Sequence, residues 1–142
     1  MSEPIMEFII KLKPGETSRM ECPTGKVAFL PFEGYVKSDL FTGTILPGAA
    51  DVQTTDASGI RHMCARYMFK GTDCEGKECY LFVDNNGYFE PGSQPSPFRT
   101  CPTFLTDSEA LAPYLHQARF RTEGHPGDGG PVIKVFDVLK ED

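Results

Sequence analysis

The chain has 142 residues, among them 14 Gly, 12 Pro and no Trp, and carries a formal net charge of −6. This acidic balance disfavours nucleic acids and anionic membranes as partners, because both are bound by clusters of Lys and Arg. So many turn-forming residues favour an architecture of short strands over one of long helices.

The length predicts a single domain over residues 1–142. The longest apolar run near the N-terminus, residues 8–10, is too short for the core of a signal peptide or for a membrane span. The cysteine count is odd, which argues against a disulfide framework. We therefore expect a cytoplasmic protein with five free thiols, at Cys22, Cys64, Cys74, Cys79 and Cys101.

In the first part of the chain, apolar periodicity and Gly or Pro breaks predict strands over residues 6–13, 25–33, 40–46 and 50–54. Pro31 has no amide donor, so the second of these strands should lie at a sheet edge or contain a bulge.

The middle of the chain reads as a hairpin. Residues 56–59 have turn chemistry, and two strands, 60–70 and 78–84, follow in antiparallel order before a second turn at Asn85-Asn86-Gly87. The two faces of strand 60–70 carry Ile60, His62, Cys64, Arg66, Met68 and Lys70 on one side and Arg61, Met63, Ala65, Tyr67 and Phe69 on the other.

Residues 88–102 contain four Pro and predict a long loop or lid. Asp107 begins the only good helix signal, and strands over 115–122 and 132–139 are joined by a Gly-rich loop, 124–130. Seven or eight mostly antiparallel strands indicate a small barrel or sandwich. We favour an all-β, lipocalin-like (calycin-like) barrel with one short helix, because closing the sheet leaves no exposed edge.

Short motifs occur in a fixed order along the chain: Gly25-Lys-Val, Phe32-Glu-Gly34, Gly43-x-Ile-Leu-Pro-Gly-x-Ala-Asp51, Asp56-x-x-Gly59, Ala65-Arg-Tyr67, Asn85-Asn-Gly87 and Phe98-Arg-Thr-x-Pro-x-Phe104. In this order they resemble the family catalogued as domain of unknown function 3237 (UPF0311). The resemblance implies a single-domain β-barrel with a central cavity, often oligomeric, whose biochemical role is not settled. Val52 stands where the family commonly has an aromatic residue, so a ligand that stacks there would be bound differently.

Asp51 and Arg66 are the first candidates for a site. Asp51 follows a Pro-Gly kink and Arg66 lies within a strand, so we expect both to point into one cavity. A buried Arg and a buried carboxylate must be paired, either with each other as a brace between strands or with a polar ligand. Asp51, Arg66 and Tyr80 are the predicted catalytic residues, and the predicted ligand contacts are Arg99, Phe104, Tyr67, Tyr114 and Asn86.

A metal site is the weaker interpretation of the His and Cys residues. His62 and Cys64 share a strand face and Cys74 and Cys79 flank a turn, but their spacing matches no standard zinc motif. A cysteine nucleophile would need a base oriented by a third group, and no such signature is present. We therefore expect no metal and no organic cofactor.

Two functions remain open. The first is a small-molecule-binding barrel, with proton-transfer chemistry of the isomerase, cyclase or lyase type on a carbonyl-bearing or aromatic metabolite. In it Asp51 would move the proton and Arg66 would stabilise an enolate-like oxygen, with Tyr80 or Arg99 orienting the substrate. The alternative is a noncatalytic subunit or scaffold of a homo-oligomer, with the two-faced apolar strand around residues 29–32 as the contact between copies.

Overall fold

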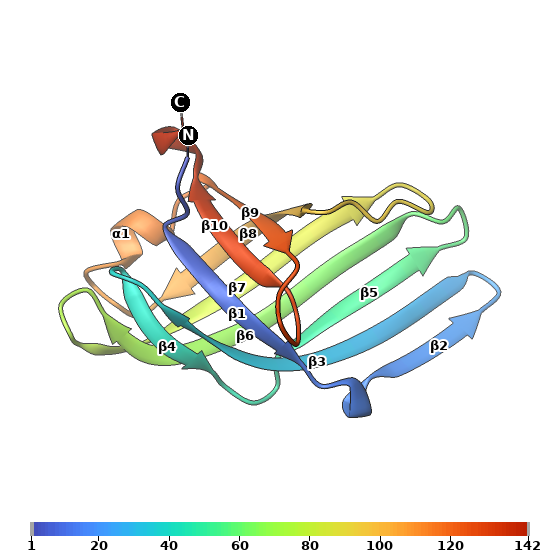
Figure 1. The fold of residues 1–142 in the computed structure, drawn as a ribbon, viewed down its shortest axis with the longest axis horizontal. Helices are drawn as coiled ribbons and strands as arrows, with labels where there is room; N and C mark the ends of the chain where they lie inside the picture. Colours follow the sequence, from blue (N-terminus) through green and yellow to red (C-terminus); the bar gives the residue numbers. More distant parts are fainter. Residues whose placement is uncertain (1, 142) are drawn as a thin grey trace.

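A computed structural model describes residues 2–141, which fold into one antiparallel sheet that closes into an eight-stranded β-barrel (Figure 1). The strands are β1 Met6–Leu12, β2 Ser18–Cys22, β3 Gly25–Lys37, β4 Phe41–Ile45, β5 Ala50–Asp56, β6 Arg61–Asp73, β7 Glu78–Phe89, β8 Phe98–Thr106, β9 Phe120–His125 and β10 Val132–Asp137. Within residues 2–141 there is one α-helix, α1 (Ala112–Leu115), and the 3₁₀ turns η1 and η2 are Pro14–Glu16 and Val138–Lys140.

Pairing of β1 with β3 closes the sheet, which otherwise runs β1-β10-β9-β8-β7-β6 and returns to β3 through β4 and β5. β4 and β5 occupy one strand position end to end, because both pair with β3 on one side and β6 on the other. The ten strands of residues 2–141 therefore give eight positions around the barrel. β2 occupies none of these positions, because it pairs with β3 alone. The predicted barrel with one short helix is confirmed.

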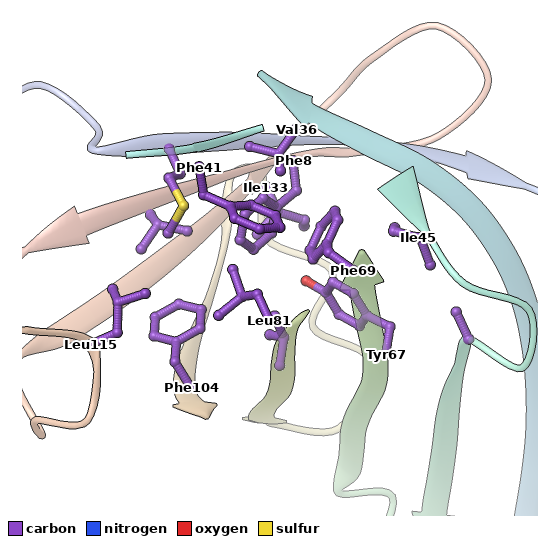
Figure 2. Close-up of a cluster of buried hydrophobic side chains, with 14 of the residues drawn as sticks. Phe8, Val36, Phe41, Ile45, Tyr67, Phe69, Leu81, Phe104, Leu115 and Ile133 are labelled. Carbon is purple, nitrogen blue, oxygen red and sulfur yellow. The ribbon is translucent and has the colours of Figure 1, made fainter. Parts of the chain in front are cut away.

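The packed core fills the half of the barrel nearest α1. Phe8, Phe69 and Leu81 are fully buried, and the ring centroids of Phe8 and Phe69 lie 4.9 Å apart. Phe69 and Leu81 are paired on the neighbouring strands β6 and β7, and Figure 2 shows them close to Phe8, which comes from β1. Every second residue of each strand contributes to this core, because successive side chains of a strand point to opposite faces of the sheet.

Several predicted boundaries are wrong. Asn85-Asn86-Gly87 is not a turn but the middle of β7, where Asn85 pairs with Ala65 and Gly87 with Met63. The partner strand β6 continues past this point, so pairing overrides the local turn chemistry. The connection to β8 is confined to residues 90–97, and the rest of the expected lid is strand.

The prediction also missed β2, all of whose residues are exposed, since no apolar alternation marks it. The helix begins at Ala112, later than expected, with Pro113 in its first turn rather than at its end. Among residues 2–141, no helix is long and apolar enough to cross a membrane.

Pro31 lies inside the sheet at a change of neighbour. Up to Phe29 the outer neighbour of β3 is β2, and from Phe32 onward it is β1. The Pro31 carbonyl accepts a hydrogen bond from the Lys13 amide at 3.1 Å. Pro31 therefore lacks its N–H group at the point where β2 ends and β1 begins. Few hydrogen bonds between strands are lost there.

A buried carboxylate fixes α1 and the C-terminal turn to the barrel. Asp137 accepts hydrogen bonds from the Tyr114 hydroxyl at 2.5 Å, from Arg119 Nε at 2.9 Å and Nη2 at 2.8 Å, and from the Leu139 amide at 3.0 Å. Burial acts to raise the pKa of Asp137, but these four donors outweigh it and hold the pKa below its ordinary value. Asp137 is thus a structural anchor, ionised and satisfied.

Replacing this anchor should unfold the protein more easily. We expect Asp137→Asn to lower the free energy of unfolding by about 2–4 kcal/mol, because a charge-assisted network is lost in a dry site. Asp84→Asn removes an exposed ion pair with Arg66 and should cost less than about 1 kcal/mol. Urea unfolding at neutral pH measures both, and equal losses would contradict the assignment.

Candidate functional site

The barrel is packed at one end and open at the other. β6 follows this division: its inward residues Tyr67 and Phe69 belong to the packed half, whereas Arg61, Met63 and Ala65 face the half where the hairpins flare apart (Figure 1). At the boundary lies a cavity of about 50 Å³, whose polar lining is Asp51, Tyr67, Asn85 and Thr100. Its apolar lining is Ile10, Phe32, Met63, Ala65, Phe98, Pro131 and Ile133.

Asp51 is the unusual group in this cavity. Its Oδ2 accepts a hydrogen bond from Gln53 Nε2 at 2.7 Å, while its buried Oδ1 has no hydrogen-bond partner within residues 2–141. Burial raises the pKa of the Asp51 carboxyl, and the Gln53 hydrogen bond and the nearby Arg61 charge only partly oppose this. A carboxyl group so placed is a stronger base than an exposed one, with one oxygen left for a ligand.

Tyr67 and Asn85 supply donors near Asp51. Figure 2 shows the Tyr67 hydroxyl directed into the barrel, and burial, with the Asp51 charge as a smaller cause, raises its pKa. Asn85 Oδ1 accepts a hydrogen bond from the Thr122 hydroxyl at 3.0 Å, which leaves its amide NH₂ to face the cavity. Ala65 pairs with both Asp51 and Asn85, and its methyl group leaves space between them.

Phe98 covers one side of the cavity. Its ring lies against the backbone of Gly124 on β9, where a Cβ atom would overlap the ring. Glycine is therefore required at position 124 for this packing, and the predicted loop role of Gly124 is wrong because it pairs with Ile133 in the sheet. The apolar cover keeps water from one wall of the site.

Gln53 links the cavity to the open half. Its Oε1 accepts a hydrogen bond from Arg61 Nη1 at 3.2 Å while its Nε2 donates to Asp51. Arg61 also donates to the Ser93 carbonyl at 3.3 Å, so the loop before β8 is tied to this chain of polar groups. The carboxyl, amide and guanidinium groups thus form one hydrogen-bonded line on the inner face.

The prediction that Asp51 and Arg66 face one cavity is wrong. Asp51 pairs with Ala65, so Arg66, the next residue along β6, points to the outer face. The Arg66 side chain is 65% exposed and lies 3.4 Å from Asp84 on the outside of the barrel. Its expected task of stabilising an oxyanion next to Asp51 has no geometric basis.

The other predicted residues divide between the outside, the packed core and the cavity. Tyr80, Arg99 and Asn86 point outward; Tyr80 is 41% exposed and Asn86 bonds His62 at 2.8 Å. Phe104 is in the packed core and Tyr114 in the Asp137 anchor, both away from the cavity lining. Of the eight residues, Asp51 and Tyr67 are the two that line the cavity.

His62 and Cys64 lie on the outer face and do not form a reactive pair. Burial raises the pKa of the Cys64 thiol, and the Asp84 charge raises it further, which favours the unreactive thiol form. Within residues 2–141, no group of three or more His, Cys, Asp or Glu side chains could hold a metal ion. Val52 also points outward, beside Cys64, so a ligand in the cavity does not touch it.

Sequence reasoning missed Asn85, Gln53 and Arg61. A signal for Arg61 was present, since the alternation of strand 60–70 sets it on the same face as Tyr67. Gln53 shares a face with Asp51 by the same rule. Asn85 was assigned to a turn, so its position inside the barrel could not be inferred.

Comparisons with solved structures extend the description of the fold. A protein of unknown function from Clostridium acetobutylicum is 22% identical, with 96% of this chain and 98% of that chain covered at a TM-score of 0.74. A conserved protein of unknown function from Rhodopseudomonas palustris is 24% identical, with 96% of each chain covered, and a β-barrel like protein from Acinetobacter baumannii is 18% identical, with 96% and 94% covered; both have a TM-score of 0.74. At such identities the likeness concerns the fold alone.

No protein with a curated description matches the chain. The family described as "Protein of unknown function (DUF3237)" matches residues 2–138. Since this match spans nearly the entire chain, the protein belongs to that family, as its ordered motifs suggested.

Proposed function

We propose that the protein binds a small carbonyl-bearing molecule in the barrel and that Asp51 exchanges a proton with it. The observation that carries this proposal is the buried Asp51 Oδ1, which lacks a partner within the described chain and lies at a cavity wall. A buried polar atom without a partner costs stability. This oxygen is free to take a proton from a C–H bond next to a carbonyl group, which is the chemistry proposed for it.

The chemistry follows from the groups around Asp51. The carboxylate takes a proton from the carbon next to a ketone, the C–H electron pair forms a C=C bond, and the carbonyl π electrons move to oxygen. The Tyr67 hydroxyl and the Asn85 amide donate hydrogen bonds to that oxygen. Return of the proton from Asp51 to the same carbon restores the ketone, and its transfer to a carbon conjugated with the enolate completes an isomerisation; in neither case do electrons leave the substrate.

The size of the cavity limits what enters it. About 50 Å³ accommodates the carbonyl end of a ligand, and the remainder would extend along the inner face past Gln53 toward the open half. The proposed substrates are therefore small and unbranched at the carbonyl.

A second proposal concerns assembly. Met20 on β2 and Phe29 on β3 are 56% and 48% exposed on the outer face, and within the described residues β2 has a strand neighbour on one side only. Two copies of β2 paired antiparallel about Met20 would set Arg19 opposite Glu21 of the partner subunit. We propose that a homodimer forms through this edge.

Proton exchange tests the first proposal directly. In D₂O, wild-type protein should accelerate deuteration of the carbons flanking the ketone of methyl 4-oxopentanoate, followed by proton NMR. Asp51→Asn should slow the protein-dependent rate by at least about 100-fold, because the base is lost. Tyr67→Phe should slow it by about 100-fold, because one donor to the enolate is lost.

Arg66→Gln is the matched control on the outer face of the same strand and should leave the rate unchanged. Equal rates for wild type and Asp51→Asn, or no acceleration by wild type over buffer, would contradict the proposal.

The raised pKa of Asp51 predicts how stability changes with pH. The folded protein holds this proton more tightly than the unfolded chain does, so stability falls as pH rises from about 4 to the folded value. Asp51→Asn removes this fall and should be more stable than wild type near pH 8 by on the order of 1 kcal/mol, with little difference near pH 3. Urea unfolding across this range measures the difference; parallel curves for the two proteins would refute the assignment.

A charge swap tests the dimer. Glu21→Lys should shift the protein toward monomer in sedimentation or light scattering, because it sets like charges opposite Arg19. The double variant Arg19→Glu, Glu21→Lys restores opposite charges and should restore the dimer. A monomeric wild type, or no rescue by the double variant, would exclude this interface.

A further inference from the structure

Arg61 is held in place without a negative partner. Its guanidinium lies over the Phe89 ring at 4.6 Å and donates to Gln53 Oε1 and to the Ser93 carbonyl, all of which are uncharged. Within the described residues, no carboxylate lies within ion-pair distance of it. A guanidinium has five N–H donors, so three remain for another acceptor.

Arg61 lines the open half of the barrel, in a hollow of about 490 Å³. Arg19 and Lys26 line the same hollow, and Glu21 is its one acidic lining residue. The hollow is thus net cationic in a protein whose overall charge is −6. This local reversal of sign favours an anionic ligand over a neutral one.

The distance from Arg61 to Asp51 is short. The two hydrogen bonds through Gln53 measure 2.7 and 3.2 Å. With an amide about 2.2 Å wide between them, no more than roughly 8 Å separates the guanidinium nitrogen from the carboxyl oxygen. This separation is within the length of one small molecule, which would lie across Gln53 to reach both groups.

We propose that Arg61 binds the carboxylate of an oxo acid whose carbonyl end enters the Asp51 cavity. This inference rests on the proposed function, which concerns the carbonyl end of the ligand. It adds that the ligand carries a carboxylate and that this carboxylate lies a short distance from the carbonyl group. The favoured ligands are acids in which a short aliphatic segment separates a carboxylate from a ketone. The segment must be short because only Gln53 lies between Arg61 and Asp51.

Binding of an anion at Arg61 would also act on Asp51. The Arg61 charge is one of the influences that lower the pKa of the Asp51 carboxyl. A carboxylate paired with Arg61 would neutralise that influence, so Asp51 would become more basic when the correct ligand is bound. The anionic end of the ligand would in this way contribute to proton transfer at the other end.

An acid and its uncharged methyl ester share the ketone and differ in charge at the other end. Comparing their affinities therefore tests the Arg61 end of the site alone. We expect 4-oxopentanoate to bind wild-type protein at least about tenfold more tightly than its methyl ester, measured by calorimetry at low salt, because a charge-assisted hydrogen bond is worth about that much. Arg61→Gln should abolish this preference without weakening the ester. Arg61→Lys, which keeps the charge, should retain part of it, and Arg66→Gln should retain all of it.

The variants also distinguish failure of this inference from failure of the proposed function. Equal affinities of wild type for acid and ester, failure of the acid to bind, or a preference that survives in Arg61→Gln would overturn the anion site. Asp51→Asn should slow the deuteration of both acid and ester by at least about 100-fold and should keep the preference for binding the acid. If it slows neither while Arg61→Gln still loses the preference, the anion site stands and the role of Asp51 does not.

Discussion

The pairing of β1 with β3 is the contact on which the rest of the structure depends. It extends only from Leu12 opposite Phe32 to Phe8 opposite Val36, whereas the first part of β3 pairs with β2 instead. β2 does not reach a further strand, so the sheet is closed over one half of its length and open over the other. A sheet that closes in this way must pack its interior where it is shut and can admit a ligand where it is not.

The two halves of the interior have correspondingly different chemistry. In the closed half, aromatic and aliphatic side chains fill the space around Phe69. In the open half, the inward residues of β5 and β6 include Asp51, Gln53 and Arg61. Asp51 lies at the boundary, deep enough for burial to raise its pKa and near enough to the opening to be reached. This position suits a group that must change protonation state in contact with a ligand.

Such a site weakens the fold that carries it. Within residues 2–141 the Asp51 Oδ1 has no partner and opposes folding, while the closed half and the satisfied Asp137 anchor support it. Polar groups left unsatisfied in an otherwise consistent structure are where function is expected. The contrast between Asp137, with four donors, and Asp51, with one, separates a structural carboxylate from a candidate functional one.

The sequence by itself determined the class of fold and most of the strands, because a period of two and Gly or Pro breaks are local properties of the chain. The alternation of residues 60–70 also predicted correctly that Arg61 and Tyr67 share one face of the strand. The partners across the sheet were decided only by the tertiary structure: pairing Asp51 with Ala65 turns Arg66 outward, and pairing Asn85 with Ala65 makes strand of a segment with turn chemistry. Register depends on contacts between residues far apart in the chain, and a shift of one residue moves every side chain to the opposite face.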